Sequence, residues 1–551
     1  MNREPLLQVR DLAIERDQDG RFTLDRVSIA VQEGEVLALI GESGSGKTTL
    51  ALSALGWVRP GLAVSHGAVH FGGVDMLAAD GKTLRGMRGH DVAYIAQSAA
   101  QSFNPRLRLS DQVIEPALVR KRMSRQDALA RAQSLYVALG LPDPQRIGTR
   151  YPHQVSGGQL QRFMIAMALL LQPRLVVCDE PTSALDVTTQ VGVLRALKAV
   201  IRDNGTAALF VSHDLSVVAQ IADRIAVMRG GALVESGATA DILERPREAY
   251  TRQLLAACRR WPASRPRQAE RAGEDAPAYL QVRGIRASYA RQDATGAPAQ
   301  PALDDVSLTV GRGRILAVIG ESGSGKSTLA RVIAGLHPPS SGELVVEGET
   351  LAPALEARTR RQLQRIQLVF QSADTALNSQ HTVGRILGRA LSFFGHADRA
   401  GRQRRIEELL GMVKLPKHYV DRKPGQMSGG EKQRVNLARA LAAEPDVLLC
   451  DEITSALDTV VAGSIVKLVE ELRDRLNLAI IFISHDMATV SALANDVLVL
   501  RNGRVVEEGS VDQVLSRPVD SYTRLLLDSV PELRQGWLED VTAVRSEVAS
   551  A

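Results

Sequence analysis

A short glycine-rich segment occurs twice in this chain. Residues 41–49 read Gly-Glu-Ser-Gly-Ser-Gly-Lys-Thr-Thr, and residues 320–328 read Gly-Glu-Ser-Gly-Ser-Gly-Lys-Ser-Thr. Both fit the pattern G-x-x-x-x-G-K-[ST], in which glycines let backbone N–H groups curl around phosphate oxygens. A glycine-rich turn that binds nothing is the alternative, and the duplication argues against it. We therefore expect two nucleotide sites, each between a strand and a helix.

The repeat extends over the whole chain. Ser156, Asp179 and His213 recur as Ser428, Asp451 and His485, always 272 residues later. This register predicts a first domain over residues 1–258, a flexible linker over 259–278, a second domain over 279–530 and a C-terminal tail over 531–551 without an assigned role. The linker holds five arginines and three prolines. This composition is typical of a solvated tether, although a nucleic-acid or lipid contact is the alternative.

Composition excludes several classes of protein. The 551 residues are 45% hydrophobic and 23% charged, which is ordinary for a globular protein, and each half is long enough to bury its own core. A net charge of +5 does not by itself indicate a nucleic-acid partner. Three cysteines, of which Cys178 and Cys450 lie in apolar runs as small buried side chains, indicate a reducing compartment. With no leader and no apolar run of about 18 residues, we expect any membrane association to be peripheral.

Apolar strands alternate with helices in each half. Residues 36–40, 175–178 and 207–211 are predicted strands, and Lys47 begins a helix after the first. Residues 124–127 resemble a capping box that opens another helix. This alternation predicts an α/β fold with a parallel sheet.

Residues in and after the glycine-rich loops carry the expected phosphate chemistry. Lys47 and Lys326 should reach the β- and γ-phosphates, while Thr48 and Ser327 should offer a hydroxyl to Mg²⁺. The nucleotide contacts expected here come from Gly41, Ser43, Gly44, Ser45, Gly46, Lys47, Thr48 and Thr49, and from Gly320, Ser322, Gly323, Ser324, Gly325, Lys326, Ser327 and Thr328.

Two acidic residues end a later apolar strand in each half. Asp179-Glu180 and Asp451-Glu452 follow Cys178 and Cys450. Because successive strand residues point to opposite faces, the two carboxylates should have different tasks. Asp179 and Asp451 suit the magnesium shell, and Glu180 and Glu452 suit the water that attacks the γ-phosphate. A solvated turn is the alternative for such a pair when no phosphate loop precedes it.

A third element opens an apolar helix in each half. It comprises Ser156, Gly157, Gly158 and Gln159, and Ser428, Gly429, Gly430 and Glu431. Serine is a good N-cap, and the glycines behind it expose N–H groups to an anion. A generic phosphate-loop enzyme has no use for this second anion-binding surface.

With this element the chain resembles the ATP-binding cassette (ABC) family over nearly all of its length. The resemblance implies two tandem nucleotide-binding domains, each with a parallel sheet, a helical subdomain and an N-terminal antiparallel β region. It also implies that two ATP molecules are sandwiched head to tail, with Ser428, Gly429 and Gly430 facing ATP on Lys47. Ser156, Gly157 and Gly158 would then face ATP on Lys326.

The same resemblance assigns further residues. Gln97 and Gln371 match the glutamine that contacts Mg²⁺ and the transmembrane partner. His213 and His485 match the histidine that contacts the γ-phosphate and join Glu180 and Glu452 as catalytic residues. Residues 183–186 and 455–458 match the family's D-loop.

The adenine contact departs from the family pattern in the first half. Tyr289 stands where the family stacks an aromatic ring on adenine, but Arg16 occupies that register in the first half, and Phe22 is the substitute candidate. Ile453 replaces Pro181 after the acidic pair, and Glu431 replaces Gln159. Since no catalytic group is lost, both sites are expected to be competent.

Local features resemble the ATPases of bacterial dipeptide, oligopeptide and nickel importers. These include residues 102–105, residues 151–154 and the closing Tyr250-Thr251 and Tyr522-Thr523 pairs. The resemblance implies two separate permease subunits, an extracytoplasmic solute-binding protein and a place on the cytoplasmic face of the bacterial inner membrane. No iron–sulfur cluster is expected, because the cysteine-rich C-terminal segment of many relatives is missing. The alternative is a soluble tandem ABC ATPase acting on ribosomes or nucleic acid, which the short linker and the lack of zinc-type cysteines disfavour.

Overall fold

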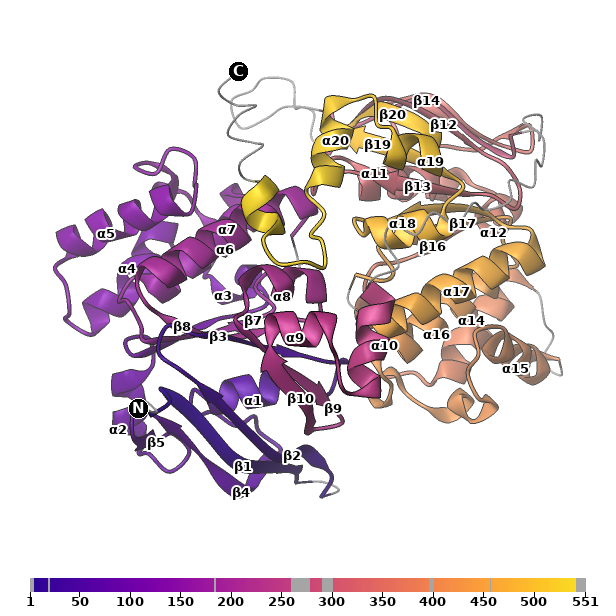
Figure 1. The fold of residues 1–551 in the computed structure, drawn as a ribbon. Helices are drawn as coiled ribbons and strands as arrows, with labels where there is room; N and C mark the ends of the chain where they lie inside the picture. Colours follow the sequence, from indigo (N-terminus) through magenta and orange to yellow (C-terminus); the bar gives the residue numbers. More distant parts are fainter. Residues whose placement is uncertain are drawn as a thin grey trace. The chain divides into compact units, whose positions relative to one another are not determined.

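The computed structural model describes residues 4–17, 20–182, 185–258, 278–289, 301–395, 401–455 and 457–541 (Figure 1). The chain forms two compact units, one of Met1–Arg259 with Ser529–Ala551 and one of Arg260–Asp528. The expected linker, except for Ala278, and the D-loop residues Ser183, Ala184 and Ala456 lie outside the described residues.

The first unit holds two sheets. One is antiparallel, in the order β2-β1-β4-β5; the other is six-stranded, in the order β10-β9-β3-β8-β7-β6, and only its β9–β10 pair is antiparallel. The strands are β1 (Leu7–Arg16), β2 (Phe22–Val31), β3 (Val36–Ile40), β4 (Leu62–Phe71), β5 (Val74–Asp75), β6 (Val92–Ile95), β7 (Leu175–Asp179), β8 (Ala207–Val211), β9 (Arg224–Arg229) and β10 (Ala232–Ala238).

The second unit repeats this topology. Its sheets have the orders β12-β11-β14-β15 and β16-β17-β18-β13-β19-β20. The strands are β11 (Leu280–Ala287), β12 (Leu303–Val310), β13 (Ile315–Ile319), β14 (Ser341–Val346), β15 (Glu349–Thr350), β16 (Ile366–Val369), β17 (Val447–Asp451), β18 (Ala479–Ile483), β19 (Asp496–Arg501) and β20 (Arg504–Ser510).

The helices also correspond between the two units. Those of the first are α1 (Lys47–Ser53), α2 (Gly81–Met87), α3 (Ala99–Ser102), α4 (Leu109–Val119), α5 (Arg125–Ala138), α6 (Gly157–Leu169), α7 (Val187–Asp203), α8 (Leu215–Ile221), α9 (Thr239–Glu244) and α10 (Ala249–Cys258). Those of the second are α11 (Lys326–Ile333), α12 (Arg360–Arg365), α13 (Ala373–Ala376), α14 (Val383–Phe394), α15 (Arg402–Met412), α16 (Gly429–Leu441), α17 (Thr459–Leu476), α18 (Met487–Leu493), α19 (Val511–Ser516) and α20 (Ser521–Asp528).

The strands predicted over residues 36–40, 175–178 and 207–211 are present as β3, β7 and β8. Their apolar runs are buried on both faces of the sheet. Every residue of β3, β7 and β8 is buried, as expected for parallel strands covered on both sides. Along β7, Leu175 and Val177 pack with the antiparallel sheet, whereas Val176 and Cys178 pack with the core that includes α4, α5 and α6. Burial also raises the pKa of the Cys178 thiol, so Cys178 is the small buried side chain that its position predicts.

The expected helix after residue 124 is present, but its cap differs from a full capping box. Ser124 Oγ accepts a hydrogen bond from Asp127 N at 3.1 Å. In return, the Asp127 carboxylate accepts a bond from the Ser124 hydroxyl, not from its backbone N–H. In the described residues, no helix is long and apolar enough to cross a membrane.

Two ion pairs keep their place in both units while their charges are exchanged. Glu33–Arg174 in the first unit corresponds to Arg312–Asp446 in the second. Likewise, Glu35–Arg224 corresponds to Arg314–Asp496. The duplication has therefore preserved ion pairing between the starts of strands rather than the residues that make it.

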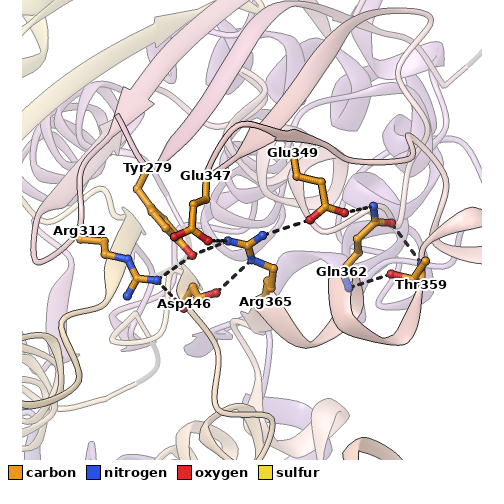
Figure 2. Close-up of polar contacts among 8 residues, drawn as sticks. All are labelled: Tyr279, Arg312, Glu347, Glu349, Thr359, Gln362, Arg365 and Asp446. Carbon is orange, nitrogen blue, oxygen red and sulfur yellow. Dashed lines mark hydrogen bonds and ion pairs between the residues drawn. The ribbon is translucent and has the colours of Figure 1, made fainter. Parts of the chain in front are cut away.

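The second unit builds a larger polar network on one of these pairs (Figure 2). The Arg365 side chain is only 7% exposed, and it donates hydrogen bonds to Tyr279 Oη and the carboxylates of Glu347, Glu349 and Asp446. These partners come from the residue before β11, the turn between β14 and β15, β15 itself and the segment before β17. Arg365 thus joins the antiparallel sheet to the parallel core.

Replacing this arginine should destabilise the second unit. Arg365→Met removes a buried donor that Tyr279, Glu347, Glu349 and Asp446 share, so we expect the free energy of unfolding to fall by about 2–3 kcal/mol. Arg404→Met is the control, because the Arg404 side chain is 87% exposed and its ion pair should contribute less than about 0.5 kcal/mol. Calorimetric unfolding of the full chain measures both variants. Equal unfolding temperatures would contradict a stabilising role for Arg365.

Candidate functional site

Both glycine-rich loops adopt the backbone that their glycines permit. Gly41, Gly44 and Gly46 have φ values of 145°, 81° and 94°. A Cβ atom on Gly41 would lie 2.1 Å from Met228 O, so no larger residue fits there. Gly44 has open space on its Cβ side within 4 Å. The loop is therefore packed against β9 at its start and open near its middle, as a phosphate cradle requires.

Each loop lysine lies inside its own loop. Lys47 Nζ donates to Gly41 O at 2.7 Å and to Glu42 O at 2.8 Å, and Lys326 Nζ donates to the carbonyls of Gly320 and Glu321 at 2.8 and 2.7 Å. A buried ammonium at this point suits a phosphate oxygen. In the second loop, the buried Ser324 hydroxyl has no hydrogen-bond partner among the described residues, and a phosphate would supply one.

A hydroxyl and a carboxylate meet beside each loop. Thr48 Oγ1 donates to Asp179 Oδ1 at 3.1 Å, and Ser327 Oγ donates to Asp451 Oδ1 at 3.0 Å. Burial raises the pKa of both aspartates despite these hydrogen bonds. Oxygen donors next to a phosphate cradle fit a magnesium ion, whose charge would compensate the buried carboxylate.

The neighbouring glutamate is held from two sides. In the first unit, Gln97 Nε2 donates to Glu180 Oε2 at 2.8 Å, and His213 Nδ1 lies 3.0 Å from Glu180 Oε1. In the second, Gln371 Nε2 donates to Glu452 Oε2 at 2.8 Å, and the distance from His485 Nδ1 to Glu452 Oε1 is 3.7 Å. A glutamine and a histidine from two separate segments therefore meet at each glutamate.

These contacts shift the protonation of the pair. Burial opposes the charged imidazole, but the hydrogen bond and charge of the glutamate outweigh it and raise the pKa of His213 and His485. Burial also opposes the charged carboxylate of Glu452, but the nearby His485 outweighs this effect and lowers the pKa of Glu452. The second site therefore favours an ionised glutamate, which suits a group that orients water.

Both glutamates have a left-handed backbone, with φ values of 50° for Glu180 and 48° for Glu452. Such a conformation costs a non-glycine residue about 1 kcal/mol or more and persists where the surroundings enforce it. Here the hydrogen bonds from Glu180 N to Val211 O and from Glu452 N to Ile483 O fix the turn. The different positions of the Asp179 and Glu180 carboxylates therefore result from this turn rather than from strand alternation alone.

The two serine–glycine segments form capping boxes. Ser156 Oγ accepts from Gln159 N at 3.3 Å, while Gln159 Oε1 accepts from Ser156 N at 3.1 Å. Ser428 and Glu431 make the same reciprocal pair at the start of α16. A Cβ atom on Gly158 would lie 2.3 Å from Thr189 Cγ2, whereas on Gly157 it would meet no atom within 4 Å. Gly158 thus serves helix packing, and Gly157 leaves an open surface.

Tyr289 reaches the helix that follows the second loop. Its hydroxyl lies 3.2 Å from Thr328 Oγ1, and its ring stacks on His337 at a centroid distance of 4.5 Å. The residue is 60% exposed, so a ring surface is accessible. In the first unit, Arg16 ends β1 and Phe22, which is 50% exposed, begins β2.

Two kinds of tyrosine contact were not predicted from the sequence. Tyr94 on β6 donates to Asp179 Oδ2 at 3.1 Å, and Leu368 occupies its place in the second unit. Tyr250 and Tyr522 accept hydrogen bonds from Glu42 N and Glu321 N at 3.1 and 2.9 Å, which anchors the loop backbones. The sequence signal for this contact was that Tyr250 and Tyr522 recur at the constant spacing of 272 residues.

The comparisons with known proteins agree with this geometry. A sequence model described as ABC transporter matches residues 24–183 and 303–455. The chain belongs to the ABC transporter family. A second model, the C-terminal region of oligopeptide/dipeptide transporters, matches residues 234–283 and 506–551. The expected fold class of two ABC-type units and the resemblance to peptide-importer ATPases are thereby confirmed.

Similar curated proteins cover nearly the whole chain. The peptidoglycan transport ATP-binding protein YejF of Agrobacterium fabrum is 37% identical over 537 residues, 96% of each chain. The glutathione import ATP-binding protein GsiA of Escherichia coli is 34% identical over 557 residues, 95% of this chain and 88% of that one. The solved structure of cbiO1 from Clostridium perfringens, part of the ABC transporter complex cbiONQ, aligns with 44% of this chain and 91% of its own, at 28% identity and a TM-score of 0.38.

These findings make this ABC protein an ATP-binding ATPase that drives transport. The loop lysines, the acidic pairs, Gln97, Gln371, His213 and His485 gather at two sites, one within each unit. The serine–glycine segments lie at the starts of α6 and α16.

Tyr94 should tune magnesium binding at the first site only. Tyr94→Phe removes one hydrogen bond that orients Asp179. We therefore expect the Mg²⁺ concentration that half-saturates ATP binding at the first site to rise about 10-fold. The measurement is a Mg²⁺ titration of nucleotide binding in a Lys326→Ala background, with the Lys47→Ala background as control for the second site. An unchanged half-saturation at the first site would contradict the orienting role.

Proposed function

We propose that this ATPase energises the import of peptides or a related small solute, of the dipeptide, oligopeptide or nickel class. The proposal is supported chiefly by the two matches to the C-terminal region of oligopeptide/dipeptide transporters, one after each ATPase core. The names of the relatives, which transport peptidoglycan or import glutathione, point to the same class of cargo.

The proposed partners are two separate permease subunits and, through them, an extracytoplasmic solute-binding protein. The chain would then act at the cytoplasmic face of a bacterial inner membrane. Gln97 and Gln371 are suited to relay motion to the permeases, because each connects the glutamate of its site to α3 or α13, which begin at Ala99 and Ala373. We expect no nucleic acid among the partners.

We further propose that each ATP is bound by both units. Lys47 and the first loop hold the triphosphate on one side, and Ser428, Gly429, Gly430 and Glu431 hold it on the other. Lys326 pairs in the same way with Ser156, Gly157, Gly158 and Gln159. The open surface beside Gly157 supports a ligand contact there, since helix N-termini with exposed N–H groups favour anions.

The proposed hydrolysis step uses the held glutamates. Lys47 and Lys326 exchange loop carbonyls for phosphate oxygens. The residues that would hold Mg²⁺, which would neutralise charge on the phosphates, are Thr48, Asp179 and Gln97 at the first site and Ser327, Asp451 and Gln371 at the second. Glu180 and Glu452 orient the attacking water, while His213 and His485 turn from the glutamate to the γ-phosphate. Tyr289 offers its ring to adenine at the second site.

Removing both glutamate charges should stop turnover without preventing ATP binding. For the double variant Glu180→Gln, Glu452→Gln, we expect steady-state hydrolysis to fall by at least about 100-fold while bound ATP is retained, because positioning of the water is lost. The matched control is Glu42→Gln, Glu321→Gln, which changes two loop glutamates outside the carboxylate cluster. Undiminished hydrolysis in the first variant would refute the assignment.

Partner capture separates transport from the rival function. Affinity purification of the full chain from membranes solubilised in mild detergent should recover two polytopic subunits in equal amounts. Peptide uptake into vesicles holding that complex and ATP should require Glu180 and Glu452. Recovery of ribosomes or nucleic acid in place of membrane subunits would overturn the transport proposal.

A further inference from the structure

The chain returns to its first unit after completing the second. Residues up to Asp528, the last residue of α20, belong to the second unit, whereas Ser529 and the residues after it group with the first. In Figure 1 the yellow residues 529–541 lie beside α7 and α8. Residues 529–541 are called the tail segment here.

Apolar side chains of the tail segment enter the core of the first unit. Trp537 and Leu538 are 3% and 2% exposed and join the apolar cluster that contains α7 and α8. Leu533 and Val541 pack against the same cluster. A tryptophan buried to this degree makes a large contribution to holding a segment in place.

One glutamine of α8 recognises the backbone of the tail segment. Gln220 is 1% exposed, and its Nε2 donates to the carbonyls of Glu532 and Arg534, both at 2.8 Å. Its Oε1 accepts from Leu538 N at 3.1 Å. The amide therefore uses both ends on the tail segment, which fixes its register on the helix.

An ion pair adds a side-chain contact. Lys198 on α7 donates to Glu539 Oε1 at 2.6 Å and to Gln220 O at 2.5 Å. The Lys198 side chain is only 14% exposed, so water screens this pair less than an ordinary surface pair. Lys198 thus connects the helix, the glutamine and the tail segment.

The second unit lacks this receptor. At the constant spacing of 272 residues, Ala492 stands in place of Gln220 and Glu470 in place of Lys198. An alanine cannot bond the backbone of a segment, and a glutamate would repel Glu539. The tail segment can therefore bind in this way to the first unit but not to the second.

We propose that the tail segment is a clasp that keeps the second unit attached to the first at every stage of the ATP cycle. The tail segment binds α7, which follows the D-loop, and α8, which follows His213. It therefore contacts the helices that come directly after these two loops in the chain. The partner is a segment of the same chain with buried aromatic and backbone contacts, and nucleotide takes no part in the contact. The inference needs neither the proposed cargo nor the proposed sharing of ATP.

The test separates the clasp from the peptide connection over residues 259–278. A protease site is placed at residues 266–270 of the full chain and the folded protein is cleaved. EDTA then removes divalent ions, and gel filtration removes the released nucleotide. We expect the two fragments to elute together at micromolar concentration. Trp537→Ala or Gln220→Ala should weaken their association by at least about 100-fold, so that they elute apart.

Charge exchange provides the matched control. Lys198→Glu should weaken fragment association, and the double variant Lys198→Glu, Glu539→Lys should restore it in part, because the ion pair returns while the hydrogen bond to Gln220 O does not. Partial recovery excludes misfolding as the cause. Arg534→Ala should leave association within about 3-fold, because Gln220 contacts only its backbone carbonyl. Uncleaved protein should elute as a monomer.

Three results would overturn the clasp. Fragments with an intact tail segment could separate without nucleotide, or Trp537→Ala fragments could stay together as firmly as the unaltered ones. An uncleaved chain that elutes as a dimer and becomes monomeric on Trp537→Ala would assign the tail segment to a second copy.

Discussion

The parallel strands of each six-stranded sheet end at one edge, and the chemistry of the protein depends on this constraint. The first loop follows β3, Gln97 follows β6, Asp179 ends β7, and His213 follows β8. Residues spread over more than 170 positions therefore meet within hydrogen-bond distance, as they do at the carboxyl edge of other parallel sheets. Burial of both sheet faces fixes the strands and hence the site.

Within that site, the structure holds its charged groups in mutual contact. The loop lysine bonds carbonyls of its own loop, and the glutamate is shared by a glutamine and a histidine. Nucleotide offers each of these groups a stronger partner, because phosphate oxygens and Mg²⁺ carry full charges. A binding energy that favours one arrangement over another is what drives a conformational shift in a transporter ATPase.

Much of this was predictable because it depends on local patterns. The apolar runs before Gly41 and Asp179 predicted buried strands, and the duplicated motif predicted a tight glycine-rich loop after a strand in each unit. Tyr94 was not predicted, since its role arises from β6 pairing with β7 and the repeat replaces it by Leu368. The left-handed turn at Glu180 and the docking of Trp537 on α8 depend on tertiary contacts between distant segments, which no local pattern encodes.

Counting the ATP bound to non-hydrolysing chains tests most directly whether each nucleotide is shared between the units. In the Glu180→Gln, Glu452→Gln background, Lys47→Ala and Ser428→Arg should each leave one ATP per chain. Combining them should still leave one, because both act on the same nucleotide. Combining Lys47→Ala with Ser156→Arg should leave none. If Lys47→Ala with Ser156→Arg leaves one ATP and Lys47→Ala with Ser428→Arg leaves none, each nucleotide is held within a single unit and the account is wrong.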